Sequence, residues 1–279
     1  MDEGANVNDT QASSDREARR TDHFTDRTVF ITGGTSGSGL RAAERFLAAG
    51  ANVVINGRTR DRGEQASERL RAISPRVLFI QADGGQYDEI AAALDEAAAH
   101  FGGIDVLVSA GASEGASPKP FVEMTSSEVV SGLTTLFAAR ILPLHAALPH
   151  LRQRPGASAV LLTTDAGRSA TTGESVIGAY AAAVIQMTKS LARELARERI
   201  RVNAVSMTLT EDTLTWDSIF ASESFERKVF VKAAARFPFG APPQAADVAA
   251  AIVFLASSAA EQITGQTLSV NGGLSFGGW

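Results

Sequence analysis

The stretch that decides the fold lies near the start of the chain, where a β-branched run passes directly into a cluster of glycines. It reads Val29-Phe30-Ile31-Thr32-Gly33-Gly34-Thr35-Ser36-Gly37-Ser38-Gly39-Leu40. The run up to Ile31 predicts a buried strand, and a helical pattern begins at Leu40. Glycines at such a junction let the backbone turn tightly, and a helix N-terminus favours an anion. The stretch therefore predicts a site for the diphosphate of a dinucleotide; a tight turn without a ligand is the alternative.

The rest of the chain alternates short apolar runs with longer, alanine-rich segments. We predict strands over residues 28–31, 52–56, 76–82, 106–109, 160–164, 201–206 and 266–270, and helices over 40–49, 61–72, 87–101, 126–153, 176–199 and 245–257. Because the strand segments are apolar nearly throughout, they suit parallel strands that are covered on both faces. The sequence therefore predicts an α/β fold with a Rossmann-like, doubly wound parallel sheet of about seven strands in a single domain.

Two parts of the chain depart from this alternation. Residues 1–24 are polar and charged, and they bury too little apolar surface to offset the entropy lost on ordering, so we expect a disordered tail. The dinucleotide-binding domain then covers residues 25–279. Within it, residues 211–243 carry many aromatic side chains in a region with closely spaced prolines. Their place after the sixth strand favours a substrate lid, with core packing as the alternative.

Composition limits the kinds of partner and site. The 279 residues are 44% hydrophobic, enough for a sizeable core, and their net charge of -5 disfavours a nucleic-acid surface. The absence of cysteine excludes disulfides and a thiol nucleophile and fits a reducing cytoplasm. No stretch approaches the roughly 20 apolar residues of a membrane span. No two of the 4 histidines lie one helical turn apart. We therefore expect a cytoplasmic protein with no nucleic-acid or membrane partner and no catalytic metal.

The tip of the second strand bears on which dinucleotide is bound. There the chain reads Asn56-Gly57-Arg58-Thr59-Arg60, without a carboxylate. A fold that binds NAD places an acidic residue on the ribose hydroxyls at this point, whereas a guanidinium can pair with a 2′-phosphate. Arg58 therefore favours NADP over NAD. The alternative is that Arg58 and Arg60 are ordinary exposed charges.

Further motifs follow the glycine-rich turn in an order that a known family shares. They are Thr32, Gly33, Gly37 and Gly39 in the turn, then Val108-Ser109-Ala110-Gly111, Tyr180, Ser190-Leu191-Ala192-Arg193-Glu194-Leu195, Ile200-Arg201-Val202-Asn203-Ala204-Val205, Ile263-Thr264-Gly265-Gln266 and Asn271-Gly272-Gly273. On these residues the chain resembles the short-chain dehydrogenase/reductase family from about residue 28 to its end. The resemblance implies a homodimer or homotetramer that acts on a small-molecule substrate.

The resemblance also implies which residues hold the cofactor. The residues of the turn are Gly33, Thr35, Ser36, Gly37, Ser38 and Gly39, and those after the fourth strand are Ala110 and Gly111. Asp83 falls where the family contacts the adenine ring. Met207-Thr208 replaces the usual Pro-Gly after the sixth strand, so Thr208 is a candidate cofactor contact or, alternatively, an ordinary loop hydroxyl.

The catalytic set of the family is an Asn, a Ser, a Tyr and a Lys, of which the lysine lowers the pKa of the phenol. In this chain Tyr180 is present, but Val184 stands four residues later, where the resemblance implies the lysine. The asparagine position falls at Leu136, or at Thr135 if the register slips by one, and neither carries an amide. A phenol without such a lysine has a pKa of about 10 and is protonated at neutral pH. It can therefore donate a proton more readily than it can accept one.

The serine position of the family is occupied by Thr164, although the loop from there to Tyr180 is about three residues longer than usual. Its hydroxyl is a candidate to hold a substrate carbonyl. Asp165 beside it is a candidate acid–base partner if burial raises its pKa; the alternative is a loop residue that binds its own backbone.

Taken together, the residues predict an NADP-dependent oxidoreductase that reduces a carbonyl or enone on a bulky apolar molecule. Tyr180 is the expected proton donor, and Thr164 orients the oxygen. Two alternatives stay open because the catalytic set is degenerate. One is a non-redox enzyme of the same fold, such as an isomerase, dehydratase or cyclase. The other is a non-catalytic subunit that pairs with an active relative.

Overall fold

The structure, a computed structural model, describes residues 24–111, 117–221, 223 and 225–276. Its centre is a parallel sheet of seven strands in the order β3-β2-β1-β4-β5-β6-β7. The strands are β1 (Thr28–Thr32), β2 (Asn52–Gly57), β3 (Val77–Gln81), β4 (Val106–Ser109), β5 (Ser158–Thr164), β6 (Arg201–Met207) and β7 (Thr267–Val270). The sheet confirms the predicted doubly wound α/β fold.

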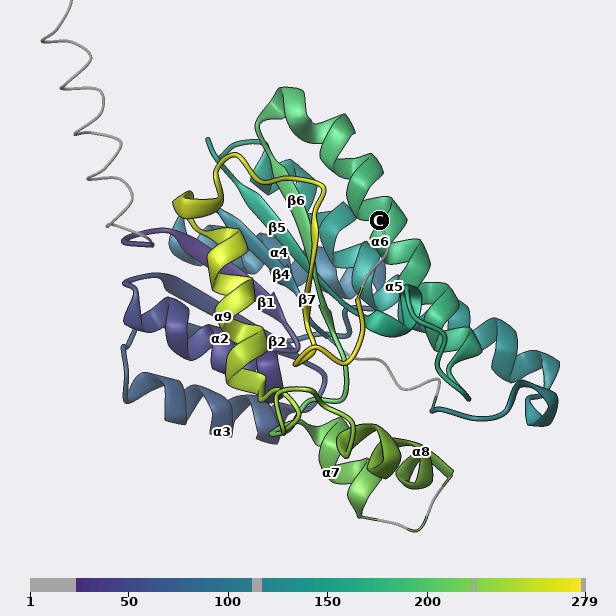
Figure 1. The fold of residues 1–279 in the computed structure, drawn as a ribbon. Helices are drawn as coiled ribbons and strands as arrows, with labels where there is room; N and C mark the ends of the chain where they lie inside the picture. The colour runs from purple at the N-terminus through teal and green to yellow at the C-terminus, as the bar shows by residue number, and fades with distance from the viewer. Residues whose placement is uncertain (1–23, 112–116, 222, 224, 277–279) are drawn as a thin grey trace, which may run out of the picture.

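Helices cover both faces of the sheet (Figure 1). One face carries α2 (Gly37–Ala48), α3 (Arg60–Arg71) and α9 (Ala245–Ala256). The opposite face carries α4 (Tyr87–Phe101), α5 (Ser126–Leu151) and α6 (Ser175–Leu195). Between these elements lie short 3-10 helices, η1 (Phe121–Glu123), η2 (Asp165–Gly167), η3 (Ala196–Glu198) and η4 (Ser258–Ala260).

The central strand β1 shows why the sheet needs two cores. All five of its residues are buried. Because successive side chains of a strand point to opposite faces, Phe30 enters the core under α4, α5 and α6, while Val29 and Ile31 enter the core under α2 and α9. A strand that is apolar on both faces is therefore stable only between two helical layers.

The strand order reverses direction at β1. The chain first adds β2 and β3 on one side of β1 and then crosses to add β4 on the other side. Ligands of open α/β sheets bind in the crevice at the carboxyl ends of the strands, where the order reverses. Here that crevice lies beside Thr32 and Ser109, which end neighbouring strands in register.

The segment expected to form a lid contains two helices, α7 (Leu214–Phe220) and α8 (Phe225–Ala234). They project from one end of the sheet (Figure 1). Leu209, Ile219 and Phe237 form a small apolar core of their own, separate from the two cores of the sheet. The sequence analysis predicted a lid here and did not predict these helices.

Two expectations need correction. The tail was expected to include residue 24, but Phe24 is fully buried and packs edge-on against Phe46 with the ring centroids 4.8 Å apart; residues 1–23 lie outside the described part. The sequence also suggested no segment that could span a membrane, whereas α5 is long and apolar enough by length and composition, with a hydropathy of 1.4. In this fold α5 packs against α4, α6 and β4.

Candidate functional site

A cavity of about 980 Å³ lies at the carboxyl ends of the central strands. Its walls come from the turn after β1, the end of β4, the η2 turn, the start of α6 and the α7–α8 segment. The predicted cofactor residues that line it are Gly33, Ser36, Gly37, Ser38, Gly39, Ala110, Gly111 and Thr208, and the predicted catalytic residues that line it are Thr164, Asp165 and Tyr180. The two predicted halves of the site therefore share one cavity.

The glycine-rich turn is too tight for side chains at two of its positions. A Cβ on Gly39 would lie 2.3 Å from the carbonyl oxygen of Gly33. A Cβ on Gly33, whose φ is 66°, would lie 2.7 Å from Cα of Gly111. Both contacts are closer than real Cβ atoms come, so only glycine allows β1, α2 and the end of β4 to meet here.

The polar groups of the turn fit a diphosphate. Helix α2 begins at Gly37, and the side chain of its N-cap, Ser36, accepts no capping hydrogen bond. The first N–H groups of α2 are thus available to an anion. Ser38 Oγ is buried and has no hydrogen-bond partner in the described part of the chain. A phosphate oxygen would satisfy both the hydroxyl and the helix N-terminus.

Thr32 positions the end of β4 next to this turn. Its Oγ1 accepts hydrogen bonds from the backbone N–H groups of Ala110, at 3.1 Å, and Gly111, at 3.0 Å. These contacts hold the β4 loop against the floor of the cavity. They explain how Ala110 and Gly111 come to face the same space as the turn.

Residues at the ends of β2 and β3 lie on the other side of the turn. Asn56 has a structural role, because its buried amide donates at 3.1 Å to the carbonyls of Ile80 and Ala82. A Cβ on Gly57 would lie 2.9 Å from Cγ2 of Thr35, so the tip of β2 touches the turn. Arg58 follows Gly57 directly in the chain and is exposed. It therefore lies beside the turn, at the position expected for a residue that binds a 2′-phosphate.

Asp83 follows β3 and uses its carboxylate locally. Its Oδ1 accepts a hydrogen bond of 2.8 Å from the backbone N–H of Gly85, and its own N–H donates to Glu89 at 2.9 Å. Asp83 does not line the cavity. The structure therefore shows a loop-capping role, and the expected adenine contact stays a prediction.

Tyr180 lies on α6 and is 7% exposed. Val184, one turn later, is fully buried, so the space of the absent lysine holds an apolar side chain. Thr164 ends β5 and caps the η2 turn, where its Oγ1 accepts a weak 3.4 Å hydrogen bond from the N–H of Ala166. Both hydroxyls border the cavity, as the proposed proton donor and carbonyl-orienting group must.

The placement of Tyr180 assumed an insertion of about three residues in the preceding loop. Without that insertion, the tyrosine position of the family would fall at Ile177 and its lysine position at Ala181. Ile177 also lines the cavity, and Ala181 is fully buried. Neither register places a lysine one turn after the tyrosine position, so the site lacks this cation under both.

The sequence analysis missed Arg140, which lines the cavity from α5. Its guanidinium donates a hydrogen bond to the carbonyl oxygen of Gly111 and interacts with the hydroxyl of Tyr180. Burial lowers the pKa of Arg140, and the interaction with Tyr180 opposes that shift. One signal was present in the sequence. Between Glu128 and Arg152, Arg140 is the only Lys, Arg, Asp or Glu in a long apolar segment.

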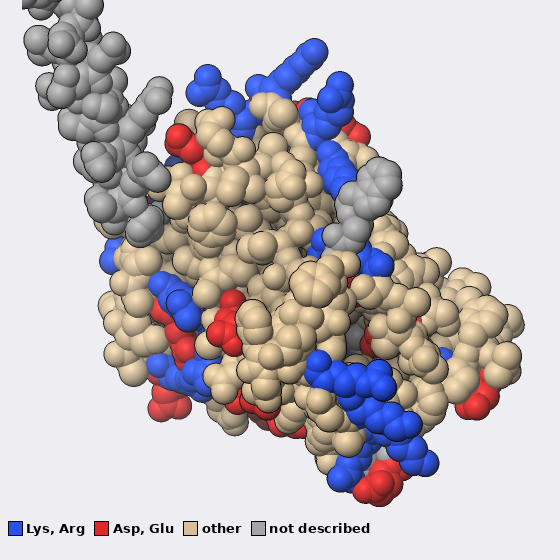
Figure 2. All heavy atoms as spheres, in the orientation of Figure 1, with Lys and Arg blue, Asp and Glu red and all other residues tan. Residues whose placement is uncertain are grey.

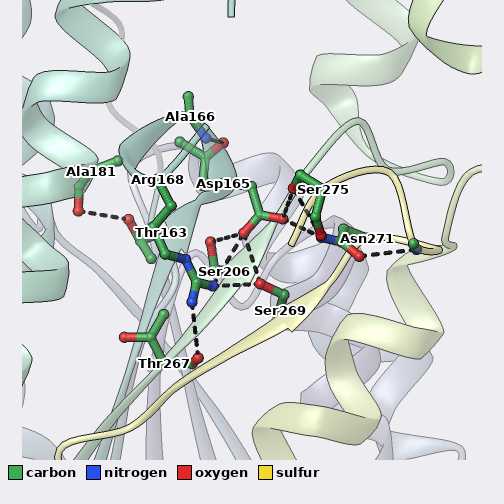
Figure 3. A network of polar contacts seen from close by, with 12 residues as sticks. Thr163, Asp165, Ala166, Arg168, Ala181, Ser206, Thr267, Ser269, Asn271 and Ser275 are labelled. Carbon is green, nitrogen blue, oxygen red and sulfur yellow. Dashed lines mark hydrogen bonds and ion pairs between the residues drawn. The ribbon is translucent and has the colours of Figure 1, made fainter. Parts of the chain in front are cut away.

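Asp165, the candidate acid–base residue, is held by side chains from distant parts of the chain (Figure 3). Its Oδ1 accepts from the hydroxyls of Ser206, at 2.5 Å, and Ser269, at 2.9 Å. Its Oδ2 accepts from the amide of Asn271, at 2.5 Å, and the hydroxyl of Ser275, at 2.9 Å.

Arg168 also faces the Asp165 carboxylate, with Nη2 3.3 Å from Oδ1. The same guanidinium donates to the hydroxyl of Ser269 and to the carbonyl of Thr267. With five donors, the carboxylate of Asp165 is an anchor between β5, β6 and the segment after β7. This differs from both roles considered for Asp165, a free acid–base group and a residue bound to its own backbone.

Charged side chains from the α8 segment and from the start of α6 also line the cavity. Lys228, Lys232 and Arg236 follow one another at helical spacing along α8 and just beyond it. Figure 2 shows basic side chains gathered over α7 and α8. Glu174, at the start of α6, borders the same space, and burial raises its pKa.

Comparisons with known proteins agree with this geometry. Residues 33–275 match the family model described as enoyl-(acyl carrier protein) reductase. The chain is 32% identical over 251 residues to cis-4-hydroxycyclohexanecarboxylate dehydrogenase of Sinomonas cyclohexanicum, covering 90% of this chain and 97% of that protein. It is 32% identical over 252 residues to a 3-oxoacyl-(acyl-carrier-protein) reductase of Staphylococcus aureus, covering 89% and 98%.

A solved structure adds a bound cofactor to the comparison. It is the NADPH-bound structure of a short-chain oxidoreductase of Pseudomonas aeruginosa, described as containing an atypical catalytic center. The TM-score is 0.83 at 27% identity, and the match covers 92% of this chain and 100% of that chain.

Proposed function

Because this chain belongs to the short-chain dehydrogenase/reductase family and is therefore an oxidoreductase, we propose that it reduces a carbonyl or enone with NADPH. The observation that carries the proposal is the shared cavity. The glycine-rich turn, with its buried Ser38 hydroxyl and uncapped helix N-terminus, lines the same cavity as Tyr180 and Thr164. Dinucleotide and substrate would thus meet in one cavity.

In this proposal, some residues bind the cofactor and others orient the substrate or donate a proton. Bound at the turn, NADPH would supply the hydride. Thr164 donates a hydrogen bond that orients the carbonyl oxygen of the substrate, and Tyr180 donates the proton that this oxygen acquires. A neutral phenol serves this direction well, because it needs no base to remove its proton first. The walls contributed by α7 and α8 would limit the access of water.

Arg58 supports NADPH over NADH. It extends from the tip of β2, next to Thr35 of the turn, and the tip has no carboxylate to contact a ribose 2′-hydroxyl. A guanidinium there would pair with the 2′-phosphate through two parallel hydrogen bonds. The NADPH-bound relative from Pseudomonas aeruginosa agrees with this choice.

The cavity suggests a substrate with an apolar body and an anionic end. Leu209, Trp216 and Ile219 provide apolar lining, as the sequence analysis expected for a bulky apolar substrate. The basic side chains of α8 would favour a carboxylate or phosphate at the mouth. One relative acts on a hydroxycyclohexanecarboxylate, a ring that carries such a group. This refines the expected substrate without changing the reaction.

Assembly and location follow the same proposal. We propose a homodimer or homotetramer in the cytoplasm, without a nucleic-acid or membrane partner. A net charge of -5 and the absence of cysteine support this setting. Light scattering of the purified full chain gives the oligomeric state directly, and a monomer at all concentrations would overturn that part.

Turnover with a panel of ring ketones and enones, with and without a carboxylate, tests the reaction. Oxidation of NADPH should accompany formation of the alcohol or the saturated ketone. With an active substrate, Tyr180→Phe should lower kcat/KM by about 100-fold or more, the usual effect of removing a general acid. Tyr87→Phe is the matched control, because Tyr87 is 42% exposed and does not line the cavity. Product formed without a change in NADPH absorbance would favour a non-redox reaction instead.

A further inference from the structure

Arg140 is a partly buried cation that forms an ion pair with no described carboxylate. Its guanidinium binds the carbonyl oxygen of Gly111, and its Nε is buried with no hydrogen-bond partner in the described part of the chain. The ion pairs of the described residues do not include it. Removing part of a charged group from water without an ionic partner is costly, so such a group often marks a functional site.

The position of Arg140 points to the reacting end of the cavity. Its own backbone carbonyl accepts a 2.8 Å hydrogen bond from Ser109 Oγ, which ties this turn of α5 to the end of β4. From there the side chain reaches Gly111 on one side and the hydroxyl of Tyr180 on the other. It thus stands between the β4 loop and the proposed proton donor.

The other charged groups of the cavity cannot fill this place. Asp165 is occupied by five donors, as described above. Lys228 and Lys232 belong to α8 and are exposed. Arg140, by contrast, interacts with Tyr180.

We propose that Arg140 is a positioning residue for the reduction, and that it supplies beside Tyr180 the positive charge that the family obtains from a lysine on the tyrosine helix. The inference rests on the proposed function. By donating to the phenol oxygen, the guanidinium turns the O–H of Tyr180 toward the substrate. It then stabilises the phenolate that remains after the proton has left.

The step balances in atoms and charge. The carbonyl carbon gains the hydride assigned to NADPH, and the C=O π electrons form the new O–H bond with the proton of Tyr180. The products are an alcohol, NADP⁺ and the phenolate. A proton from water restores the phenol. Arg140 stays protonated throughout and acts only through its charge and hydrogen bonds.

The chain offers a test that needs neither substrate nor cofactor, because it contains only 2 tyrosines. In a Tyr87→Phe background, the ultraviolet absorbance of tyrosinate reports Tyr180 alone. Adding Arg140→Met should raise the midpoint of tyrosinate formation by about one pH unit or more, the effect expected when a neighbouring cation is lost. Arg140→Gln removes the charge but keeps a hydrogen-bond donor, and it serves if the methionine variant does not fold. Arg152→Met, at the exposed end of the same helix, should leave the midpoint unchanged.

Kinetics then separates positioning from folding. Arg140→Met should lower kcat by about tenfold or more while the Kd for NADPH changes less than about threefold. Arg140→Lys keeps the positive charge but lacks the planar guanidinium group, so its kcat should lie between those of Arg140→Met and the wild type. A folded Arg140→Met or Arg140→Gln variant with the wild-type tyrosinate midpoint would overturn the inference. If the midpoint shifts but NADPH is never oxidised, the proposed function fails and the Arg140–Tyr180 coupling stands.

Discussion

The carboxylate of Asp165 accepts a hydrogen bond of 2.5 Å from the side-chain amide of Asn271, which joins the end of β5 to the segment that follows β7. Ser206 on β6 adds a second link to the same carboxylate. Three strands and the last described segment therefore converge on one buried anion. Since Thr164 precedes Asp165 directly, this anchor also holds the cavity wall that carries the Thr164 hydroxyl.

Replacement of Asp165 by Asn should destabilise the protein by about 3 kcal/mol, because it leaves Arg168 without its anionic partner and turns one of two acceptor oxygens into an NH2 group, so that the two donors to that oxygen lose their acceptor. Denaturant unfolding measures the loss. Glu96→Gln, the same chemical change on the exposed face of α4, should stay within about 0.5 kcal/mol of wild type. Wild-type stability together with abolished turnover would instead identify Asp165 as an acid–base residue.

Gly39→Ala should weaken NADPH binding by at least about tenfold, because the added methyl group would lie 2.3 Å from the carbonyl oxygen of Gly33 and force the turn open. Fluorescence titration with NADPH provides the Kd. Gly84→Ala is the control, since its Cβ would meet nothing closer than 3.6 Å. Equal affinity in both variants would show that the turn does not hold the diphosphate.

Arg58→Ala should raise the Kd for NADPH by about 10-fold to 100-fold and leave that for NADH nearly unchanged, which is the effect of losing hydrogen bonds to a charged phosphate. Parallel titrations with the two nucleotides measure it. Arg71→Ala, an exposed arginine at the other end of α3, should change neither constant. A parallel loss for NADPH and NADH would place Arg58 outside the 2′-phosphate site.

Charge reversal on α8 tests the anionic end of the substrate. The double variant Lys228→Glu, Lys232→Glu should raise KM for a ring ketone with a carboxylate by about tenfold, since two attractive charges become repulsive at the cavity mouth. KM for the matching amide should change little. The exposed Lys189→Glu on α6 is the control. If KM for NADPH rises instead, α8 contacts the cofactor phosphates.

Glu174 should make stability depend on pH in a defined direction. Burial raises its pKa in the folded state, so ionisation of this carboxyl opposes folding. The protein therefore has its full stability below the pKa that Glu174 has in the unfolded state. Stability declines as pH rises through the higher pKa that Glu174 has in the folded state. Glu174→Gln should be more stable than wild type at pH 8, with the gain disappearing near pH 4 in thermal unfolding. A gain that is equal at both pH values would exclude this explanation.

The architecture could be predicted from sequence because its determinants are local. The buried run that ends at Thr32, the glycines up to Gly39 and the alternation of apolar segments specify strand, turn and helix within a few residues of one another. The strands were found at the predicted positions to within two residues, and several turn residues line the cavity as expected. The helices α7 and α8 were not predicted, because a region rich in aromatic residues and proline gives no clear helical period.

Local sequence patterns thus specify the doubly wound sheet and the dinucleotide-binding turn at its centre. The surroundings of the reacting groups depend on tertiary packing. Arg140 reaches Tyr180 because α5 packs beside α6, and Asp165 meets Ser269 and Asn271 because β5, β6 and β7 lie in parallel register. Such contacts join residues 40 to 110 positions apart, and no local pattern encodes them. They depend on which side chains fill the space between packed elements.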